Sequence, residues 1–495
     1  MELKIKVLDL YTGTPVAILN KVTADKIGVK PKGRILIKSL SKEAKQISTI
    51  IDITSRLVKR NEIAISSELQ IRLNLKPKEK VQINLSPAPN SLSFIKKKMN
   101  DQKLNQKEID EIIKEVINNA LSETEIALFI SAMYNHGMNM QETIYLINSI
   151  LASGERLVID KGIVVDKHSI GGIPGNRTTP IVVAICAAAG LIVPKSSSRA
   201  ITTAAGTADV IESIAQVDFS IKDLKKLIQK TGACLIWGGS LEIVPADEKI
   251  ITIEKALNID PESQLLASIM SKKLALGAKH ILIDIPYGKT AKVQREKALS
   301  LKKKFEYLGK HFKKDLKVVL THGDEPIGNG IGPILEVMDI LKVLHRFEDR
   351  PLDLEKKSVF LAGELLEMSK KAKKGQGIKM AQEILESQKA FIKFKEIIAA
   401  QNGDFTKLKL AKFKKHILCD HKCKIVEIDN KKMNSLARIS GCPFDKSAGV
   451  YLYQHVGTTL EKKQKIITIF SESKSRLKEA VKFFYSQKPI KFKNS

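Results

Sequence analysis

The segment from Val165 to Glu212 constrains the fold of this chain most strongly, because it contains two strand–loop–helix units in succession. In the first unit, the apolar run Leu157–Val165 predicts a strand, and a glycine-rich loop of residues 171–176 follows it. The next helix is apolar, with Pro180 near its first turn and Gly190 past its end, the usual placement of these two residues.

The second unit repeats this order. A short strand, Leu191–Val193, precedes a loop of small residues, Thr202–Thr207, which opens another helix near Asp209. Such loops bind anions, because glycines let backbone N–H groups face a ligand and a helix N-terminus adds positive charge. A phosphate cradle could be completed by Lys167, Ser169, Thr179, Ser198, Arg199 and Thr207. One such loop can be only a tight connection, but two in tandem, with hydroxyls and cations, favour an anion site.

Two runs of sequence in this segment resemble the thymidine phosphorylase family of nucleoside phosphorylases. They are KHSIGGIPGN, starting at Lys167, and SSSRAITTAAGTADVIES, starting at Ser196. The second run fits the pyrimidine-nucleoside phosphorylase signature from Ser197 to Glu212. The resemblance covers nearly the whole chain and is closest to the long-chain branch of the family, which includes the AMP phosphorylases.

The pattern and the resemblance together predict a multidomain α/β and α+β fold. Residues 1–86 alternate in strand fashion and predict a small β-rich, barrel-like extension. Residues 94–156, with later returning segments such as Asp223–Lys230, predict an all-helical lobe. Strands and helices alternate over 157–400, which predicts a central α/β phosphate-binding lobe with a mainly parallel sheet. Residues 415–495 predict a C-terminal α+β domain.

Local signals place individual elements within this layout. Ser122 and Glu125 predict a capping box at the start of a helix. The apolar runs Ala233–Ile236 and Ile281–Ile285 predict strands, and Ser358–Ala399 is periodic in the manner of helices.

The charge and apolar content of the chain limit the kinds of partner that it can be expected to bind. Its 495 residues carry a formal net charge of +29, which suits an anionic substrate or a nucleic acid. The excess is mostly lysine spread along the chain, so we expect solvated lysine surface and no specific nucleic-acid partner. The longest apolar run, Pro180–Pro194, is too short to span a membrane, and the N-terminal residues lack a signal-peptide layout. We therefore expect a cytoplasmic protein with no membrane partner.

The cysteines give a weak signal for a metal. Five are present, which fits a reducing compartment. Cys419, His421 and Cys423 lie close together, with Cys442 further on, but this spacing lacks a clear second pair. Ordinary free thiols are favoured over zinc, and we predict no metal.

A second group of polar residues lies between Ala246 and Lys292. Asp260 precedes a proline that suggests a helix start, and Ser268 and Lys272 follow at intervals of eight and four residues. These intervals would place all three near one helix face, where they suit recognition of a nucleobase. The pattern alone favours a capping aspartate with solvated lysines.

The resemblance favours the functional interpretation. It implies that Asp260 is the proton donor and that Ser268 and Lys272 contact the base. Phosphate would be bound by Lys167, Ser169, Thr179 and Thr207. The matching nucleotide-binding positions are Gly172, Ser198, Arg199, Ala200, Ile201, Thr202, Thr203, Thr207, Ser268, Lys272 and Lys292. His168 matches a base-side contact of the family, and packing beside the phosphate loop is equally open.

One departure from the family bears on the substrate. Thymidine phosphorylases place a tyrosine and an arginine shortly before the aspartate, but Ile250–Lys255 contains neither. This favours the AMP-type branch, whose reaction converts AMP and phosphate into adenine and ribose 1,5-bisphosphate. Thymidine phosphorolysis is the alternative. A third glycine-rich loop, Gly323–Pro333, resembles a family loop near the substrate, and we predict that it is a closure element.

The implied enzyme is a pentosyltransferase that needs no metal or organic cofactor, since inorganic phosphate is its co-substrate. The family also implies a homo-oligomer, a dimer or larger. A phosphoribosyltransferase of the related anthranilate type shares the fold but would require Mg²⁺ and a diphosphate-bearing sugar, and the form of the signature argues against it. A non-catalytic nucleic-acid-binding protein is a more remote alternative.

Overall fold

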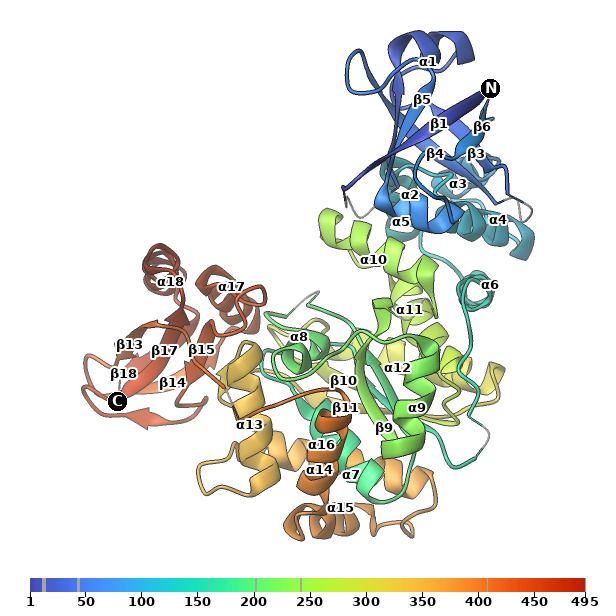
Figure 1. Cartoon of the computed structure of the whole chain (residues 1–495). Helices are drawn as coiled ribbons and strands as arrows, with labels where there is room; N and C mark the ends of the chain where they lie inside the picture. Colours follow the sequence, from blue (N-terminus) through green and yellow to red (C-terminus); the bar gives the residue numbers. More distant parts are fainter. Residues whose placement is uncertain are drawn as a thin grey trace. The chain divides into compact units, whose positions relative to one another are not determined.

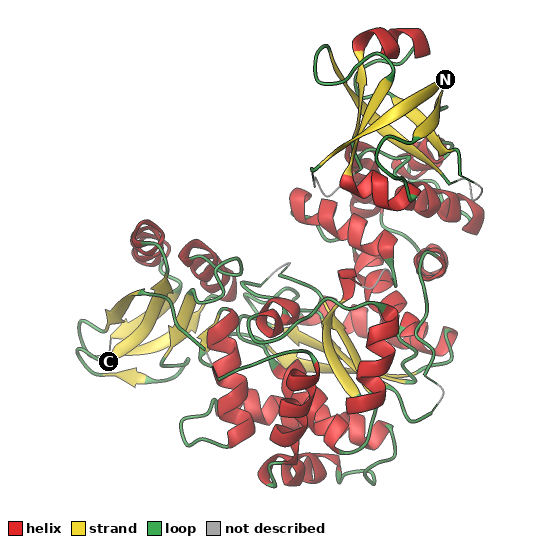
Figure 2. Cartoon of the chain, viewed as in Figure 1, coloured by secondary structure: helices red, strands yellow, loops and turns green. Residues whose placement is uncertain are grey.

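The computed structural model describes residues 1–10, 15–41, 45–159, 161–200, 203–240, 243–406 and 408–494. The chain forms two compact units, each built from two segments. The first contains Met1–Gly154 and Val244–Ser271, and the second contains Glu155–Ile243 and Lys272–Ser495. Figure 1 traces the chain by sequence, and Figure 2 distinguishes its helices and strands. The fold is mixed α/β.

The first unit begins with a closed six-stranded barrel in the order β1-β5-β2-β4-β3-β6 (Figure 1). Alternating side chains face its interior, as Ile35 and Ile37 do, which is why this segment has the sequence pattern of strands. Two short helices, α1 and α2, follow strands β2 and β5. The bounds are β1 Glu2–Leu8, β2 Ala17–Asn20, α1 Lys21–Ile27, β3 Arg34–Ser39, β4 Gln46–Thr54, β5 Glu62–Ser66, α2 Ser67–Leu73 and β6 Lys80–Leu85.

Helices complete the first unit. They are α3 Ser91–Met99, α4 Gln106–Ile117, α5 Glu123–His136, α6 Met140–Ala152, α10 Pro245–Leu257 and α11 Glu262–Ala275, the last of which ends in the second unit. The predicted capping box of Ser122 and Glu125 is confirmed at the start of α5. The returning segment is 244–271, so the prediction that Asp223–Lys230 returns to this lobe is wrong. That segment lies in α9, which packs against β9 in the second unit.

The second unit contains a parallel sheet. Its strands are β7 Val165–Ser169, β8 Val193–Ser197, β9 Ala233–Trp237, β10 His280–Tyr287 and β11 Asp315–His322. Strands β11, β10 and β7 pair in that order, β8 pairs with β9, and a parallel bridge between Val164 and Ile192 joins the two sets. The predicted strands at Ala233–Ile236 and Ile281–Ile285 are confirmed.

Two strand predictions are shifted. The strand expected at Leu157–Val165 lies at Val165–Ser169, and that expected at Leu191–Val193 lies at Val193–Ser197. Both real strands are polar, and Asp166 of β7 and Lys195 of β8 are buried in ion pairs that an apolar pattern cannot reveal.

Helices pack around this sheet (Figure 2). Helix α7 is buried almost completely, which explains its apolar sequence. The stretch Ser358–Ala399 lies within three helices separated by short turns, not one continuous helix. The bounds are α7 Thr178–Ala188, α8 Thr207–Glu212, α9 Ile221–Thr231, the 3₁₀ turn Gly238–Ser240, α12 Arg295–His311, α13 Pro333–His345, α14 Leu352–Met368, α15 Gly377–Glu386 and α16 Lys389–Ala400.

The C-terminal part of this unit is α+β. Its strands are β13 Phe413–Leu418, β14 Cys423–Ile428, β15 Gly449–Leu452, β16 Thr459–Leu460, β17 Lys465–Ser471 and β18 Ile490–Asn494, with helices α17 Asn430–Ser440 and α18 Lys474–Gln487. Strand β12, Gly330–Ile331, comes from the third glycine-rich loop and pairs with β15. The sheets run β12-β15-β17-β13 and β16-β14-β18. Among the described residues, no helix has the length and apolar character needed to cross a membrane.

Candidate active site

Strand β7 delivers the cation of the predicted phosphate site to the start of α7. Lys167 is buried, and its Nζ donates to Thr178 Oγ1 at 2.7 Å and to Thr179 Oγ1 at 3.5 Å. Ser169, two residues along the strand, accepts a hydrogen bond from Asn176 Nδ2 at 3.4 Å. The structure therefore brings Lys167 and Thr179 together, with Ser169 on the same face of the strand.

Beside Lys167, buried lysines outnumber their acidic partners. Lys357 Nζ lies 3.2 Å from Asp284 Oδ2, and Asp284 also attracts Lys167. Thr321 Oγ1 donates to the other oxygen of Asp284 at 2.6 Å. One carboxylate thus faces two ammonium groups in a region without solvent.

The same imbalance occurs on the other face of β7. Lys195 Nζ lies 3.1 Å from Asp166 Oδ1, and Lys273 Nζ lies 2.7 Å from Asp166 Oδ2. All three side chains are at least nine-tenths buried. Buried charges normally occur in balanced pairs, because desolvation of an unmatched ion is costly. An excess of basic groups over carboxylates on both faces of one strand suits the binding of an anion.

These surroundings shift the pKa values of the basic groups. Burial, reinforced by Lys357, Lys195 and Arg177, lowers the pKa of Lys167 to about 7, although Asp284 opposes the shift. Burial and then the neighbouring lysines lower the pKa of His168 well below its ordinary value. At pH 7 the His168 imidazole is therefore neutral and the Lys167 side chain is close to its titration midpoint, and a nearby anion would favour the charged lysine.

The first glycine-rich loop approaches a second predicted nucleotide residue. Gly172 has φ +94°, and a Cβ placed on it would lie 2.6 Å from Lys292 Cβ and 2.9 Å from Lys292 N. Only glycine permits this conformation without strain at such close approach. Gly172 and Lys292, which are far apart in the sequence, thus lie side by side.

The signature segment closes the second loop upon itself. Asp209 Oδ2 accepts from Ala200 N at 2.7 Å and from Gly206 N at 2.8 Å, joining the two ends of the loop. A Cβ on Gly206 would lie 2.4 Å from the Ser198 carbonyl oxygen, so only glycine fits. Thr203 Oγ1 donates to the Ala205 carbonyl oxygen at 2.7 Å. Ile201 and Thr202 lie outside the described residues.

Arg199 is paired within the protein. Its Nη1 and Nη2 each lie 2.6 Å from a carboxylate oxygen of Glu212, and its guanidinium stacks 4.5 Å above the Trp237 ring. Lys446 Nζ also contacts Glu212 at 2.6 Å. The side chain that the sequence suggests for a phosphate cradle therefore holds the loop to α8, and Glu212 in turn links α8 to Lys446.

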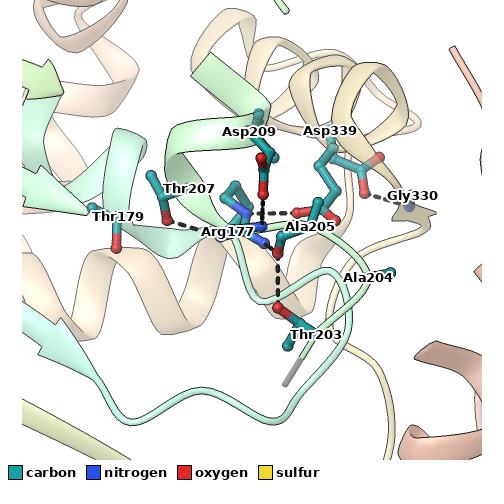
Figure 3. A network of polar contacts seen from close by, with 12 residues as sticks. Arg177, Thr179, Thr203, Ala204, Ala205, Thr207, Asp209, Gly330 and Asp339 are labelled. Carbon is teal, nitrogen blue, oxygen red and sulfur yellow. Dashed lines mark hydrogen bonds and ion pairs between the residues drawn. The ribbon is translucent and has the colours of Figure 1, made fainter. Parts of the chain in front are cut away.

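Arg177, which the sequence analysis did not single out, reaches the predicted phosphate ligand Thr207. Its Nη1 donates to Thr207 Oγ1 at 2.8 Å and its Nη2 donates to the Ala205 carbonyl oxygen at 2.8 Å (Figure 3). Its Nε contacts Glu336 Oε2 at 2.5 Å. The only sequence signal is its position immediately after the glycine-rich loop.

Carboxylates also fix the third glycine-rich loop. Asp339 Oδ2 accepts from Asn329 N and Gly330 N, each at 2.7 Å, and burial raises the Asp339 pKa to about 7 (Figure 3). Asp353 Oδ2 accepts from Gly328 N at 2.8 Å. The loop also supplies β12 to the C-terminal sheet. Its role as a closure element stays a prediction.

The predicted base-contacting serine lies in the first unit. Ser268, on α11, donates to Asp247 Oδ2 at 2.8 Å, and Gln264 Nε2 donates to Asp247 Oδ1 at 2.9 Å. Asp247, on α10, is fully buried. Sequence reasoning missed Asp247 and Gln264, because a polar residue on an amphipathic helix gives no sign of a partner on another helix.

Asp260 lies outside the helix that was expected to carry it. Helix α11 begins at Glu262, so Asp260 is in the preceding turn, and its side chain is exposed. Its spacing to Ser268 therefore does not place the two on one helix face, whereas Ser268 and Lys272 do lie one turn apart on α11. Lys272 belongs to the second unit, where it contributes to the lowered pKa of His168.

The stretch that lacks the tyrosine and arginine is part of a packed core. Ile250, Ile251 and Ile253 are buried on α10, and Glu254 is nine-tenths buried.

The cysteines are free thiols, with Cys419 Sγ 3.2 Å from Cys423 Sγ. Within the described ranges, no group of three or more His, Cys, Asp or Glu side chains is arranged to hold a metal ion.

The sequence of this chain is similar to those of known proteins. Residues 92–154 match the helical bundle domain of a glycosyl transferase family, and residues 161–391 match the a/b domain of the same family. Proteins named AMP phosphorylase from Methanococcoides burtonii and Thermococcus kodakarensis are each 40% identical to this chain. The alignments cover 99% of this chain and 97% and 98% of those proteins, respectively.

A likeness in fold alone extends further. The crystal structure of anthranilate phosphoribosyltransferase from Thermus thermophilus superposes with a TM-score of 0.51 at 17% sequence identity. It covers 62% of this chain and 99% of that one.

Proposed function

This chain belongs to the family of the AMP phosphorylases, and from that premise we propose that it cleaves AMP with inorganic phosphate to give adenine and ribose 1,5-bisphosphate. The observation that carries the proposal is Lys167, buried among an excess of cations and bonded to two threonine hydroxyls at the start of α7. Relatives 40% identical over almost their full length carry the name of this activity.

Phosphate would act as the nucleophile at C1′ of the ribose. Lys167, Ser169, Thr179 and Thr207 would hold it, with the side chains positioned before it binds. Such preorganised positioning supplies much of the rate in reactions that involve little covalent chemistry by the protein. As the glycosidic C1′–N bond breaks, a C1′–O bond to phosphate forms.

The nucleotide would be held by the loops that surround this site. The proposed contacts in the second unit are Gly172, Ser198, Arg199, Ala200, Ile201, Thr202, Thr203, Thr207, Lys272 and Lys292. Because Arg199 is committed to Glu212, its contribution would be to shape the loop rather than to bind a phosphate directly.

Asp260 would transfer a proton to the departing base. Asp260 is exposed in the segment that precedes α11. A carboxyl group donates a proton near neutral pH only when it is shielded from water, so bound substrate must cover it. Ser268 would contact the base, with its hydroxyl oriented by Asp247.

The core packing of Ile250, Ile251 and Ile253 supports AMP over thymidine as substrate. The stretch Ile250–Lys255 of α10 therefore offers no tyrosine or arginine to grip a pyrimidine. We further propose that the enzyme works without a metal or organic cofactor, as a homo-oligomer, in the cytoplasm.

Product analysis tests the reaction. We expect purified protein with AMP and phosphate to form adenine and a new sugar phosphate with two phosphorus resonances, neither of which appears without added phosphate. Added EDTA should not reduce the rate. Asp260→Asn should lower kcat by about 10²–10⁴-fold, the usual contribution of a general acid. Ribose 5-phosphate as the product would indicate hydrolysis and contradict the proposal.

A further inference from the structure

The donor pattern around Thr207 identifies a residue that acts on the phosphate site without being one of its ligands. A guanidinium group has five N–H donors and no acceptor. In the bond between Arg177 Nη1 and Thr207 Oγ1, the threonine oxygen must therefore accept. The hydroxyl proton of Thr207 is directed elsewhere, and no hydrogen bond between described residues uses it.

Arg177 is itself held in one orientation. It is 6% exposed, and its three nitrogen atoms contact Thr207, the Ala205 carbonyl oxygen and Glu336. Glu336, on α13, is anchored in turn by Gly332 N, which donates to Oε1 at 3.1 Å. The fork of arginine reaches these three acceptors from three different nitrogen atoms, whereas a lysine ammonium has only one nitrogen atom.

Lys167 acts on Thr178 in the same way. Its ammonium donates to Thr178 Oγ1, so this hydroxyl also accepts from a buried cation. Arg177 and Lys167 thus each donate to a threonine oxygen, so neither hydroxyl proton is used by its cation. Donors with their protons directed away from the cations suit a ligand made only of acceptors, as a phosphate dianion is.

We propose that Arg177 is a positioning residue for phosphate, which fixes Thr207 as a hydrogen-bond donor to the bound anion and ties the loop at Ala205 to α13. The inference rests on the proposed function, because it assumes that Thr207 contacts phosphate. It adds a residue and a hydrogen-bond direction that the family resemblance does not supply.

A double-mutant cycle tests it on the full chain. Arg177→Lys retains the charge but loses the fork, and Thr207→Val removes the hydroxyl. Each should raise the KM for phosphate about ten- to hundredfold, the effect of losing a hydrogen bond to a charged group. The KM for AMP should rise by a smaller factor than the KM for phosphate, because Thr207 is only one of the proposed nucleotide contacts. The double variant should be no worse than the more impaired single variant.

Two further variants separate positioning from support of the fold. Thr207→Ser retains the hydroxyl and should restore most of the phosphate affinity that Thr207→Val loses. Arg350→Lys weakens a comparable arginine–carboxylate contact, to Glu355 in the same unit, and should lower thermal stability without changing the phosphate KM. Binding of inorganic phosphate by calorimetry gives a readout that does not require turnover.

The outcomes distinguish the inference from the function on which it rests. Additive effects in the cycle, or equal losses for AMP and phosphate, would overturn the role of Arg177 while leaving phosphorolysis intact. An unmodified chain that neither binds phosphate nor releases adenine would overturn both. Should Arg177→Lys fail to fold, a Thr207→Val variant that folds and binds phosphate normally would also reject the proposal.

Discussion

The backbone of Lys292 occupies the space that a side chain at Gly172 would need, with Lys292 N only 2.9 Å from a Cβ built on the glycine. Gly172 also adopts φ +94°, so an alanine would be both strained and crowded. The contact sets the separation between the first glycine-rich loop and the segment that follows β10. Both residues are proposed nucleotide contacts, so their spacing should determine affinity for AMP.

Gly172→Ala should raise the KM for AMP about tenfold or more, since a misplacement of about 1 Å at a binding group can cost a hundredfold in activity. Gly190→Ala is the matched control, because Gly190 has φ +80° but its nearest neighbour, Lys371 Nζ, is 3.5 Å from the built Cβ. Both variants carry backbone strain, and only the first displaces Lys292. Steady-state kinetics with AMP as variable substrate checks this, and equal effects of the two substitutions would show that crowding is unimportant.

Anion binding should be accompanied by proton uptake near pH 8. The Lys167 pKa of about 7 in the free protein means that this side chain is mostly the neutral amine at pH 8, and a bound anion favours its charged form. Calorimetric titration with sulfate, which does not titrate in this range, in buffers of different ionisation enthalpy measures the protons taken up. We expect uptake of up to about one proton, lost in Lys167→Met. Sulfate binding without buffer dependence would contradict the assignment.

The ligand-free protein should become more stable as the pH rises from about 7 to about 9. Burial lowers the pKa values of Lys167, Lys249 and Lys273 to about 7 from an ordinary value of 10.5. Between these limits the unfolded chain binds more protons than the folded chain, so the free energy of unfolding increases with pH. Below pH 7 the folded lysines also protonate and the slope diminishes. Chemical denaturation across this range checks the sign, and a fall in stability between pH 7 and 9 would refute it.

Asp247 should influence which bases the protein accepts. Because Ser268 donates its proton to Asp247, the serine oxygen presents lone pairs to other groups and suits an amino group on the base. Asp247→Asn can donate to Ser268 and release that proton. The preference for AMP over IMP, expressed as a ratio of kcat/KM values, should fall about tenfold in this variant.

Gln264→Met provides the control for Asp247. It removes the hydrogen bond to Asp247 Oδ1 but leaves Ser268 bonded to Oδ2. We expect this variant to lose stability while keeping the AMP to IMP ratio. The specificity role of Asp247 fails if both substitutions slow the two substrates to the same extent.

The sequence predicted those elements that depend on residues close together in the chain. The capping box at Ser122 depends on residues three apart, and strand β10 is an apolar run buried on both sides. Strand β7 was placed too early, because Asp166 and Lys167 resemble loop residues until their buried partners are known. The glycine-rich loops could be identified from the sequence, because few residues other than glycine permit the close backbone contacts that these loops make.

The residues that were missed have partners far away in the chain. Arg177 and Glu336 are separated by 159 residues, and Asp247 and Ser268 join two different helices. No periodicity or spacing rule connects such positions. The prediction for Arg199 failed in a different way. Its guanidinium lies in a loop of the kind that binds phosphate, but it pairs with the Glu212 carboxylate 13 residues later.

The most direct test of the proposed reaction is to incubate the purified chain with phosphate and either AMP or thymidine and to measure the released base by chromatography. The buried cations and hydroxyls of the second unit, together with the lack of a tyrosine and an arginine in Ile250–Lys255, predict adenine from AMP and little thymine from thymidine. Release should depend on added phosphate and should be abolished in Lys167→Met. Thymine release with AMP untouched, or no base from either substrate by a folded protein, would contradict it.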